Sequence, residues 1–513
     1  MKSLSLVEAS WRVRCAVFLA IFALLLATRW PLAPQYLFFF DSVNFALALE
    51  QFNPGLHQPQ PPGYPLFVGL TKVLHLLVPR VEDVFVVSGI IGAAVAVYLL
   101  WLLGEMMFGA RAGFTSALLL LVNPVLWFSG LSNQVRVYLA TAGVAVALLA
   151  WRAWPKASPV RWFYLTALVL GLAAGFRPLA AVLLAPLLLL TGLRSRRSLG
   201  QFLVAGLLSC AAVASWLFFT ASKVGGLAGF IDLLRSYSQD QFQVSSLLYG
   251  AQLTSALGMA ENALIWNALA FLPWIWALPF VFRSTSVTDG ERYGLFLAAW
   301  FVPAFLFHAL VHVAHPDHVL ITIPVGCLLG GRVLSALSQS GDRKNRWAYA
   351  AAAACAVSLF LFFKPPSDPI RLSSYKAIRD VDRTNSAAFE SLRDMARSSR
   401  LFVITYQFPV SWRQVAYYFP DQPLLVLNTP IDSASETGNM FQFLHGEVGD
   451  PKMTGNAVAL PLGARVVILL PPDPRLKEIL QRQIPLSSHG PLLYTDVKAG
   501  TSFKFGSYSF KTR

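Results

Sequence analysis

The 513-residue sequence is poor in charge and in cysteine. Only 13% of its residues are Asp, Glu, Lys or Arg, whereas 56% are hydrophobic. This balance excludes an ordinary soluble enzyme and predicts an integral membrane protein. The four cysteines all lie in apolar segments, so neither a disulfide framework nor a cysteine-based metal site is indicated.

Long apolar segments fill the first two thirds of the chain and predict about 11 membrane-spanning helices. The net charge of +15 does not indicate nucleic-acid binding, because the basic residues fall in short loops between these segments. The spans are expected near residues 14–31, 84–104, 113–129, 136–154, 162–176, 178–193, 200–221, 262–282, 293–311, 317–337 and 347–363.

The charges also predict an orientation. With the N-terminus in the cytoplasm, 16 basic residues lie at cytoplasmic ends and loops and 7 lie on the outer side. The acids show the opposite bias, so a site that needs carboxylates is expected on the outer face. The outer acids are Asp41, Glu50, Glu82, Asp83, Asp232, Asp240, Glu261 and Asp317.

Residues 364–513 differ from the membrane part, residues 1–363, which includes a long first outer loop over 32–83. They hold 31 charged residues, against 36 in the preceding 363. Strands and helices alternate in this part, which predicts a small extracytoplasmic α/β domain with a partly parallel sheet. No glycine-rich phosphate fingerprint opens its helices, so nucleotide binding there has no support. The expected helices cover 374–398, 411–418 and 475–483, and the expected strands cover 401–405, 423–427 and 464–470.

An acidic residue follows the first span and begins the most informative stretch. Asp41 leads a short amphipathic helix that ends near Glu50, and a Pro-rich segment with His57 and Tyr64 comes after it. One interpretation is structural: Asp41 caps the helix, whose apolar face lies on the membrane surface. The other is that Asp41 and the Pro-rich segment form part of a site.

The Asp41-Ser42 pair, the short helix and the segment Pro61-Pro62-Gly63-Tyr64-Pro65 together resemble the first outer loop of GT-C glycosyltransferases. The resemblance is greatest to the bacterial protein-mannosyltransferase-like and RgtA/B/C/D-like groups. It implies a multi-span enzyme that takes a sugar from a polyprenyl-phosphate donor, with Asp41 as the catalytic base. One departure is visible, since relatives often have His-Pro-Pro where this chain has Gln60-Pro61-Pro62, with His57 earlier.

Arg177 lies between two apolar segments that are each too short to cross a bilayer alone. Both flanks are basic and favour the cytoplasm, so the hairpin is expected to turn below the outer surface. An arginine at that depth must face protein or a water-filled cavity. It can clamp the donor phosphate, as the resemblance also suggests, or it can pair or snorkel in a purely structural role.

Histidines cluster in one short segment. His308, His312 and His315 are spaced i, i+4 and i+7, which predicts one helical face, and His318 follows Pro316. With Asp317, His312 and His315 could ligate a divalent metal. The imidazoles could instead bind phosphate, as the resemblance implies for His318, or simply end a helix at the membrane surface.

Two other outer loops carry candidate residues. Asn133-Gln134-Val135-Arg136 offers Arg136 as a further phosphate ligand, but it lacks the second acid that some relatives have near this point. The loop 222–261 contains Tyr237 and Asp240. This loop is long enough to act as a lid or acceptor groove, and it is equally consistent with a plain surface connection.

The sequence therefore predicts an inverting glycosyltransferase in the bacterial cytoplasmic membrane, acting at the outer face on a polyprenyl-phosphate-linked sugar. The acceptor is a protein, a lipid or a glycan, and the use of a divalent metal stays open. A transporter or lipid flippase is the alternative. It predicts acids at mid-span and an internal repeat, neither of which the sequence shows. A non-catalytic scaffold that presents the C-terminal domain is a third interpretation.

Overall fold

The computed structural model describes most of the chain. The described residues are 5–132, 134–243, 246–281, 290–337, 345–405, 410–427, 440–444, 447–449, 453–454, 457–469, 474–505 and 508–512. The chain forms two compact units, of which the first contains residues 1–33 and 44–378. The second contains residues 34–43 and 379–513, so the segment after the first span contributes to both units.

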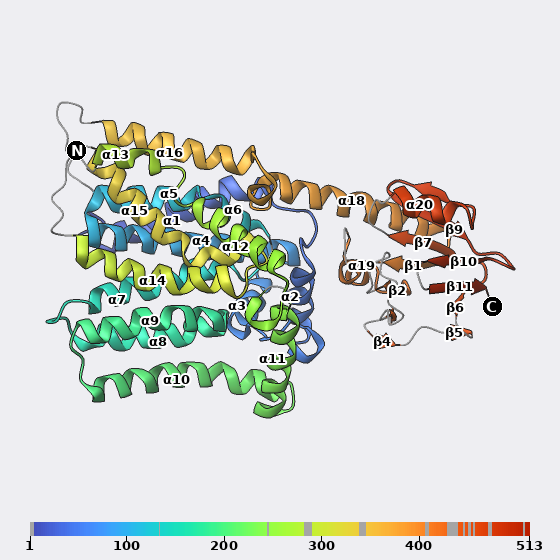
Figure 1. Ribbon diagram of the computed structural model, residues 1–513, viewed down its shortest axis with the longest axis horizontal. Helices are drawn as coiled ribbons and strands as arrows, with labels where there is room; N and C mark the ends of the chain where they lie inside the picture. Colours follow the sequence, from blue (N-terminus) through green and yellow to red (C-terminus); the bar gives the residue numbers. More distant parts are fainter. Residues whose placement is uncertain are drawn as a thin grey trace. The chain divides into compact units, whose positions relative to one another are not determined.

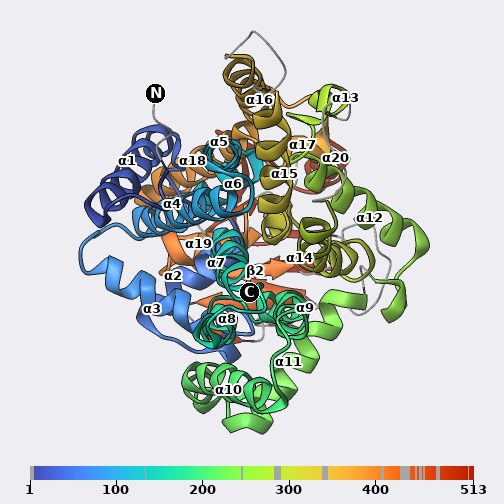
Figure 2. The same ribbon diagram turned by 90° about the vertical axis from the view of Figure 1, so that its left-hand side faces the viewer.

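The first unit is a helical bundle. Its long apolar helices run nearly side by side in Figure 1, and Figure 2 shows many of them end-on. Its α-helices are α1 (Trp11–Arg29), α3 (Pro65–His75), α4 (Val81–Phe108), α5 (Ala110–Leu121), α6 (Pro124–Leu131), α7 (Val137–Ala153), α8 (Val160–Phe176), α9 (Pro178–Arg194), α10 (Leu199–Ser222), α11 (Gly226–Gln243), α12 (Leu253–Ala268), α13 (Leu278–Val281), α14 (Gly290–Leu310), α15 (Ile323–Ala336), α16 (Arg346–Phe363) and α17 (Asp368–Arg371). Its 3-10 helices are η1 (Trp30–Leu32), η2 (Pro54–Leu56), η3 (Leu247–Tyr249), η4 (Ile275–Ala277) and η6 (Pro316–Ile321).

Within the described residues, five helices are long and apolar enough to cross a bilayer: α1, α4, α10, the apolar part of α14, and α16. The pair α5 and α6 is bent by 51° and makes a sixth span if it counts as one. Helices α7, α8, α9 and α15 are apolar but shorter. The structure thus confirms a multi-span helical membrane protein, and the figure of about 11 spans stays a prediction.

Three of the predicted spans are not continuous helices. The segment expected at 113–129 divides into α5 and α6, which are bent by 51° at the break. The segment expected at 262–282 breaks after α12, because Pro273 has no N–H and its ring clashes with a continuing helix. The segment expected at 317–337 starts as the 3-10 helix η6 and becomes α-helical only at α15, where Pro324 lies in the first turn. The break between η6 and α15 lies beside the candidate site described below.

The helix that follows the first span is buried and does not rest on a membrane surface. Helix α2 (Phe40–Glu50) begins in the second unit and continues into the first. Phe45 is fully buried, with its ring against Tyr64, Phe67 and Phe85. The expectation of a membrane-surface helix is therefore wrong, because aromatic rings of α3 and α4 cover the apolar face that carries Phe45.

The second unit contains two β-sheets and three helices. The larger sheet has the strand order β4-β3-β2-β1-β7-β9-β8, with β1 parallel to both β2 and β7. The smaller sheet has the order β10-β11-β6-β5. The elements of the second unit are α18 (Tyr375–Ser398, whose first residues belong to the first unit), β1 (Leu401–Thr405), α19 (Trp412–Tyr418), β2 (Leu424–Leu427), β3 (Met440–Leu444), β4 (Glu447–Gly449), β5 (Met453–Thr454), β6 (Ala457–Leu460), β7 (Arg465–Leu469), α20 (Pro474–Gln481), β8 (Ser487–His489), β9 (Leu492–Asp496), β10 (Ser502–Phe505) and β11 (Tyr508–Thr512).

The core of the second unit follows from the buried strands at the centre of the larger sheet. All five residues of β1 are buried, as expected for a strand covered on both faces. Phe402 and Ile404 face one apolar cluster, whereas Leu401 and Val403 face another that includes Phe389 of α18. The α/β character and the partly parallel sheet are thus confirmed. The second sheet was not predicted, because local alternation, which β10 and β11 do show, does not tell which strands pair.

Candidate functional site

The hairpin formed by α8 and α9 positions the central residue of the site. Arg177 is the single residue between the two helices and has an extended backbone (φ −156°, ψ 108°). Pro178 begins α9, where its missing N–H costs nothing. Gly175 allows the close approach, because a Cβ there would lie 2.6 Å from Leu66 of α3 and 2.9 Å from Trp216 of α10. The sequence thus fixes Arg177 at the tip of a tightly packed hairpin, as predicted.

The Arg177 guanidinium borders a small cavity inside the first unit. Leu139, Leu179 and Leu183 form its apolar wall, and His308, His312 and His318 form its polar wall. The cavity measures about 10 Å³, which is room for about one water molecule. In the part of the chain that the structure describes, no carboxylate forms an ion pair with Arg177. Among those residues, no carboxylate neutralises its charge directly.

Arg177 lies beside His318, with 3.4 Å between Nη2 and the imidazole Nε2. The backbone N–H of Ala314 donates to Nδ1 of the same ring at 3.4 Å. A neutral imidazole that accepts at Nδ1 carries its proton on Nε2. In that tautomer the 3.4 Å contact joins two N–H donors, Nη2 of Arg177 and Nε2 of His318, and an anionic oxygen within reach of both would accept from each.

Arg136 has a different environment. Its Nη1 lies 3.1 Å from Oδ1 of Asp317, and both side chains are buried, with 7% and 0% of their surface exposed. Asp317 Oδ2 is also buried and has no hydrogen-bond partner among the described residues. The charge of Arg136 is thus compensated within the protein, which leaves Arg177 as the better anion ligand of the two.

The turn that carries Asp317 and His318 is held by hydrogen bonds to its neighbours. Trp300 Nε1 of α14 donates to the carbonyl of Ile321 at 2.9 Å. Thr322 Oγ1 donates to Asn267 Oδ1 of α12 at 2.6 Å. All six residues of η6 are buried, so this turn forms a rigid floor for the site.

The histidines approach one another, but not on one helical face as predicted. Helix α14 ends at Leu310, because the backbone N–H groups of Val311 and His312 both donate to the carbonyl of Phe307. Only His308 lies on the helix. His312 and His315 come from the following turn, with their ring centres 5.6 and 6.2 Å from that of His318.

The two histidines of that turn are poised to stay neutral. Burial, followed by the nearby Arg177 and Arg136, lowers the pKa of His312 to about 4. Burial and Arg136 likewise lower the pKa of His315 to about 4. Among the described residues, no three His, Cys, Asp or Glu side chains are grouped to hold a metal ion. We therefore assign no metal role to His312, His315 and Asp317.

Three other residues that the sequence analysis named lie in the same neighbourhood. Tyr64 and Tyr237 lie close enough to Arg177 to act electrostatically on its guanidinium. The ring of His57 lies 6.0 Å from that of Tyr237. His57 and Tyr64 both have a left-handed backbone, with φ of 55° and 47°, which is costly outside glycine and concentrates at functional sites. Asp240 belongs to α11, but its side chain lies outside the described residues.

Asp41 belongs to the second unit. It lies in the first turn of α2 and is half-buried, and it is not the N-cap residue, since the helix already begins at Phe40. The side chain of Ser42 performs the capping by accepting from the backbone N–H of Phe39 at 3.2 Å. The adjacent Phe40 packs against Trp412 of α19, with the Arg413 guanidinium over its ring. The capping interpretation of Asp41 is therefore wrong, and its catalytic role stays a prediction.

Sequence reasoning did not include every residue of the cavity. His308 is 1% exposed and lines the cavity, and its spacing to His312 was the available signal. Leu139, Leu179 and Leu183 carry no signal of their own, since leucines are common throughout the membrane helices. The site as a whole has two guanidinium groups, four imidazoles and one carboxylate. Because cationic groups outnumber the single carboxylate, it suits an anion.

Comparisons with known proteins bear on the family and the fold. Residues 59–219, which include Tyr64, Arg136 and Arg177, match the family described as dolichyl-phosphate-mannose-protein mannosyltransferase. Two solved structures of ArnT from Cupriavidus metallidurans share the fold. The structure bound to undecaprenyl phosphate has a TM-score of 0.56 at 13% identity, and the apo structure has 0.57 at 14%. Both alignments cover 94% of this chain and 97% of the ArnT chain.

No curated protein sequence matches the chain. The family match over residues 59–219 and the shared fold nevertheless support one class, the membrane glycosyltransferases of the GT-C type, which this chain resembles. The predicted resemblance is thus confirmed at the level of the class, and the interpretation as a transporter without transferase activity has no support.

Proposed function

We propose that the protein transfers a sugar from a polyprenyl-phosphate donor to an acceptor hydroxyl, with inversion at the anomeric carbon. The observation that carries this proposal is the contact between Arg177 and His318 at the wall of a buried cavity, where no carboxylate among the described residues pairs with the guanidinium. A donor phosphate has the charge and the oxygen atoms that such a pair can bind, and a low-dielectric surrounding strengthens the contact. The neighbouring leucines offer an apolar wall to the lipid, and the cavity, which has room for about one water molecule, must widen to admit the phosphate.

The proposed reaction needs one base and one cationic site. Asp41 takes the proton of the acceptor hydroxyl while its oxygen attacks the anomeric carbon from the face opposite the phosphate. The bond between the anomeric carbon and the phosphate oxygen breaks, and its electron pair stays on the phosphate. Arg177 and His318 stabilise the charge that develops there, so no general acid is needed. Arg136, held by Asp317, adds a more distant positive charge.

The location of the reaction follows from the distribution of charge in the sequence. We place the site at the outer face of the bacterial cytoplasmic membrane, with the N-terminus in the cytoplasm and the C-terminal domain outside. A soluble nucleotide-sugar does not reach that face, which is why a lipid-linked donor is required. The acceptor is a protein, lipid or glycan that offers a hydroxyl.

The experiment is transfer from a radiolabelled polyprenyl-phosphate sugar by the purified protein in nanodiscs. Donor lipids with different sugars, and membrane extracts as the acceptor source, identify an active pair. Asp41→Asn should lower turnover by about 10²–10⁴-fold, because the general base is lost. Glu50→Gln, an exposed carboxylate on the same helix, is the matched control and should keep wild-type turnover. Wild-type turnover of Asp41→Asn would remove Asp41 from its assigned role.

A further inference from the structure

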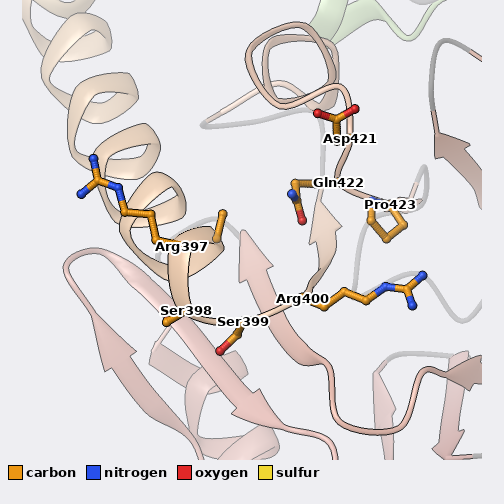
Figure 3. Close-up of a pocket in the computed structure, with 8 residues that line it drawn as sticks. Arg397, Ser398, Ser399, Arg400, Asp421, Gln422 and Pro423 are labelled. Atoms are coloured by element: carbon orange, nitrogen blue, oxygen red, sulfur yellow. The ribbon is translucent and has the colours of Figure 1, made fainter.

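A second polar site lies in the C-terminal unit, in a pocket of about 460 Å³. It is formed where α18 ends and β1 begins, together with the connection between α19 and β2 (Figure 3). Its volume falls in the range of small-molecule sites. Its lining differs from the usual apolar one, since the residues that define it are Arg397, Ser399, Arg400, Asp421 and Gln422.

The walls of this pocket are held by the sheet. The carbonyl of Arg400, just before β1, accepts from the backbone N–H of Arg465 at 2.8 Å. The carbonyl of Pro423, just before β2, accepts from the N–H of Val403 at 3.0 Å. The pocket therefore lies at the amino ends of two parallel strands, opposite to the carboxyl ends where nucleotides bind in α/β sheets.

The pocket offers donors and acceptors in comparable numbers. The Arg400 guanidinium and the amide of Gln422 donate, whereas Asp421 and the last carbonyls of α18 accept. The guanidinium of Arg397 donates to Asp394 Oδ1 at 3.2 Å, outside the lining. Arg397 and Arg400 extend in opposite directions in Figure 3, so they do not form a joint clamp. A phosphate would meet one carboxylate and the negative end of a helix here, which makes this pocket unlike the Arg177 site.

We propose that this pocket binds a neutral saccharide through its hydroxyl groups. Each hydroxyl both donates and accepts, which matches a lining that mixes guanidinium, amide, hydroxyl and carboxylate groups. The lining contains only two apolar residues, Ala396 and Pro423, which are too few to anchor a peptide through apolar side chains. The lining side chains are mostly exposed or half-buried, so the pocket opens to water and admits one end of a glycan chain. The site does not depend on the donor phosphate site in the first unit.

The test is saturation-transfer NMR on the full-length protein in nanodiscs, because glycoside detergents would compete for the pocket. The probes are mannose, glucose, galactose and N-acetylglucosamine, the disaccharides mannobiose and chitobiose, and inorganic phosphate. At least one saccharide should bind. The double variant Asp421→Asn with Gln422→Ala should weaken its binding by about tenfold or more, since a charged and a neutral hydrogen bond are lost. Arg400→Ala should weaken it further.

Matched controls on the same helix separate pocket effects from general ones. Glu390→Gln and Arg393→Ala change exposed residues of α18 that do not line the pocket, and both should bind as the wild type does. Absence of binding by every saccharide would overturn the proposal, as would binding that the pocket variants leave unchanged. Binding of phosphate alone, lost in Arg400→Ala, would identify an anion site instead. None of these readouts requires transfer activity, so the two proposals fail independently.

Discussion

Each unit contains an ion pair between an arginine and an aspartate, and the two pairs differ mainly in their surroundings. In the first unit, Arg136 and Asp317 lie 3.1 Å apart with 7% and 0% of their side chains exposed. In the second unit, Arg465 and Asp496 lie 2.7 Å apart with 21% and 54% exposed. The exposed pair is the shorter, but water screens it and hydrates both charges.

The comparison shows how the first unit can keep a positively charged ligand site in its buried interior. A buried charge is costly unless it is paired, so Arg136 requires Asp317. Arg177 has no such carboxylate among the described residues, and its charge remains available for a ligand. In the second unit, Arg465 and Asp496 contact water directly, so neither charge depends on the other as Arg136 depends on Asp317.

The largest effect on stability is expected from breaking the buried pair. Asp317→Asn leaves the Arg136 charge buried without its partner, which should lower the free energy of unfolding by about 3–5 kcal/mol. Thermal unfolding of the protein in nanodiscs would show this as a lower midpoint. Replacing both residues, as Arg136→Met with Asp317→Leu, should restore much of the stability. A single variant as stable as the wild type would show that the pair is not buried as described.

A smaller effect is expected from pH. The pKa values of His312 and His315 are lowered from 6.5 to about 4, so both rings are neutral in the folded protein at neutral pH. Between pH 4 and 6.5 the unfolded chain binds more protons than the folded protein. The stability that the two neutral rings contribute is therefore complete above pH 6.5. It is lost as the pH falls toward 4. The unfolding midpoint should therefore drop by several degrees over this window.

The double variant His312→Gln with His315→Gln isolates that effect. It should reduce the slope of the midpoint between pH 6.5 and 4, since two of the four histidines of the site no longer titrate. If the slope of the double variant equals that of the wild type, other groups cause the pH dependence, and the burial of these rings does not control it.

The smallest effect is expected from the exposed pair. Asp496→Asn should change the free energy of unfolding of the second unit by less than about 1 kcal/mol, and the change should shrink in high salt. Hydrogen exchange of the amides in β7 and β9, which pair with each other, measures this locally. A loss as large as that of Asp317→Asn would erase the contrast between the two regions.

The sequence allowed much of the fold to be predicted, because apolar length and charge patterning are local signals. The hairpin tip at Arg177 and the elements α18, β1, α19, β2, β7 and α20 appear close to where they were expected. The prediction of one span at 262–282 was wrong, because the apolar content of this segment masked the helix-breaking effect of Pro273. The pairing of Arg136 with Asp317 could not be predicted, since 181 residues separate them in sequence. The cavity could not be predicted either, because it depends on packing between helices.

The central claim is that Arg177 binds the donor phosphate. Its most direct test measures the binding of a synthetic polyprenyl phosphate by native mass spectrometry of the protein released from nanodiscs. Arg177→Ala should weaken binding by about tenfold to a hundredfold, because a charge-assisted contact is lost. Lipid binding by Arg177→Lys should lie between that of the wild type and that of Arg177→Ala, since lysine keeps the charge but not the forked geometry. Arg161→Ala, an exposed arginine at the start of α8, is the control and should bind as the wild type does. Equal lipid binding by Arg177→Ala and the wild type would contradict the account.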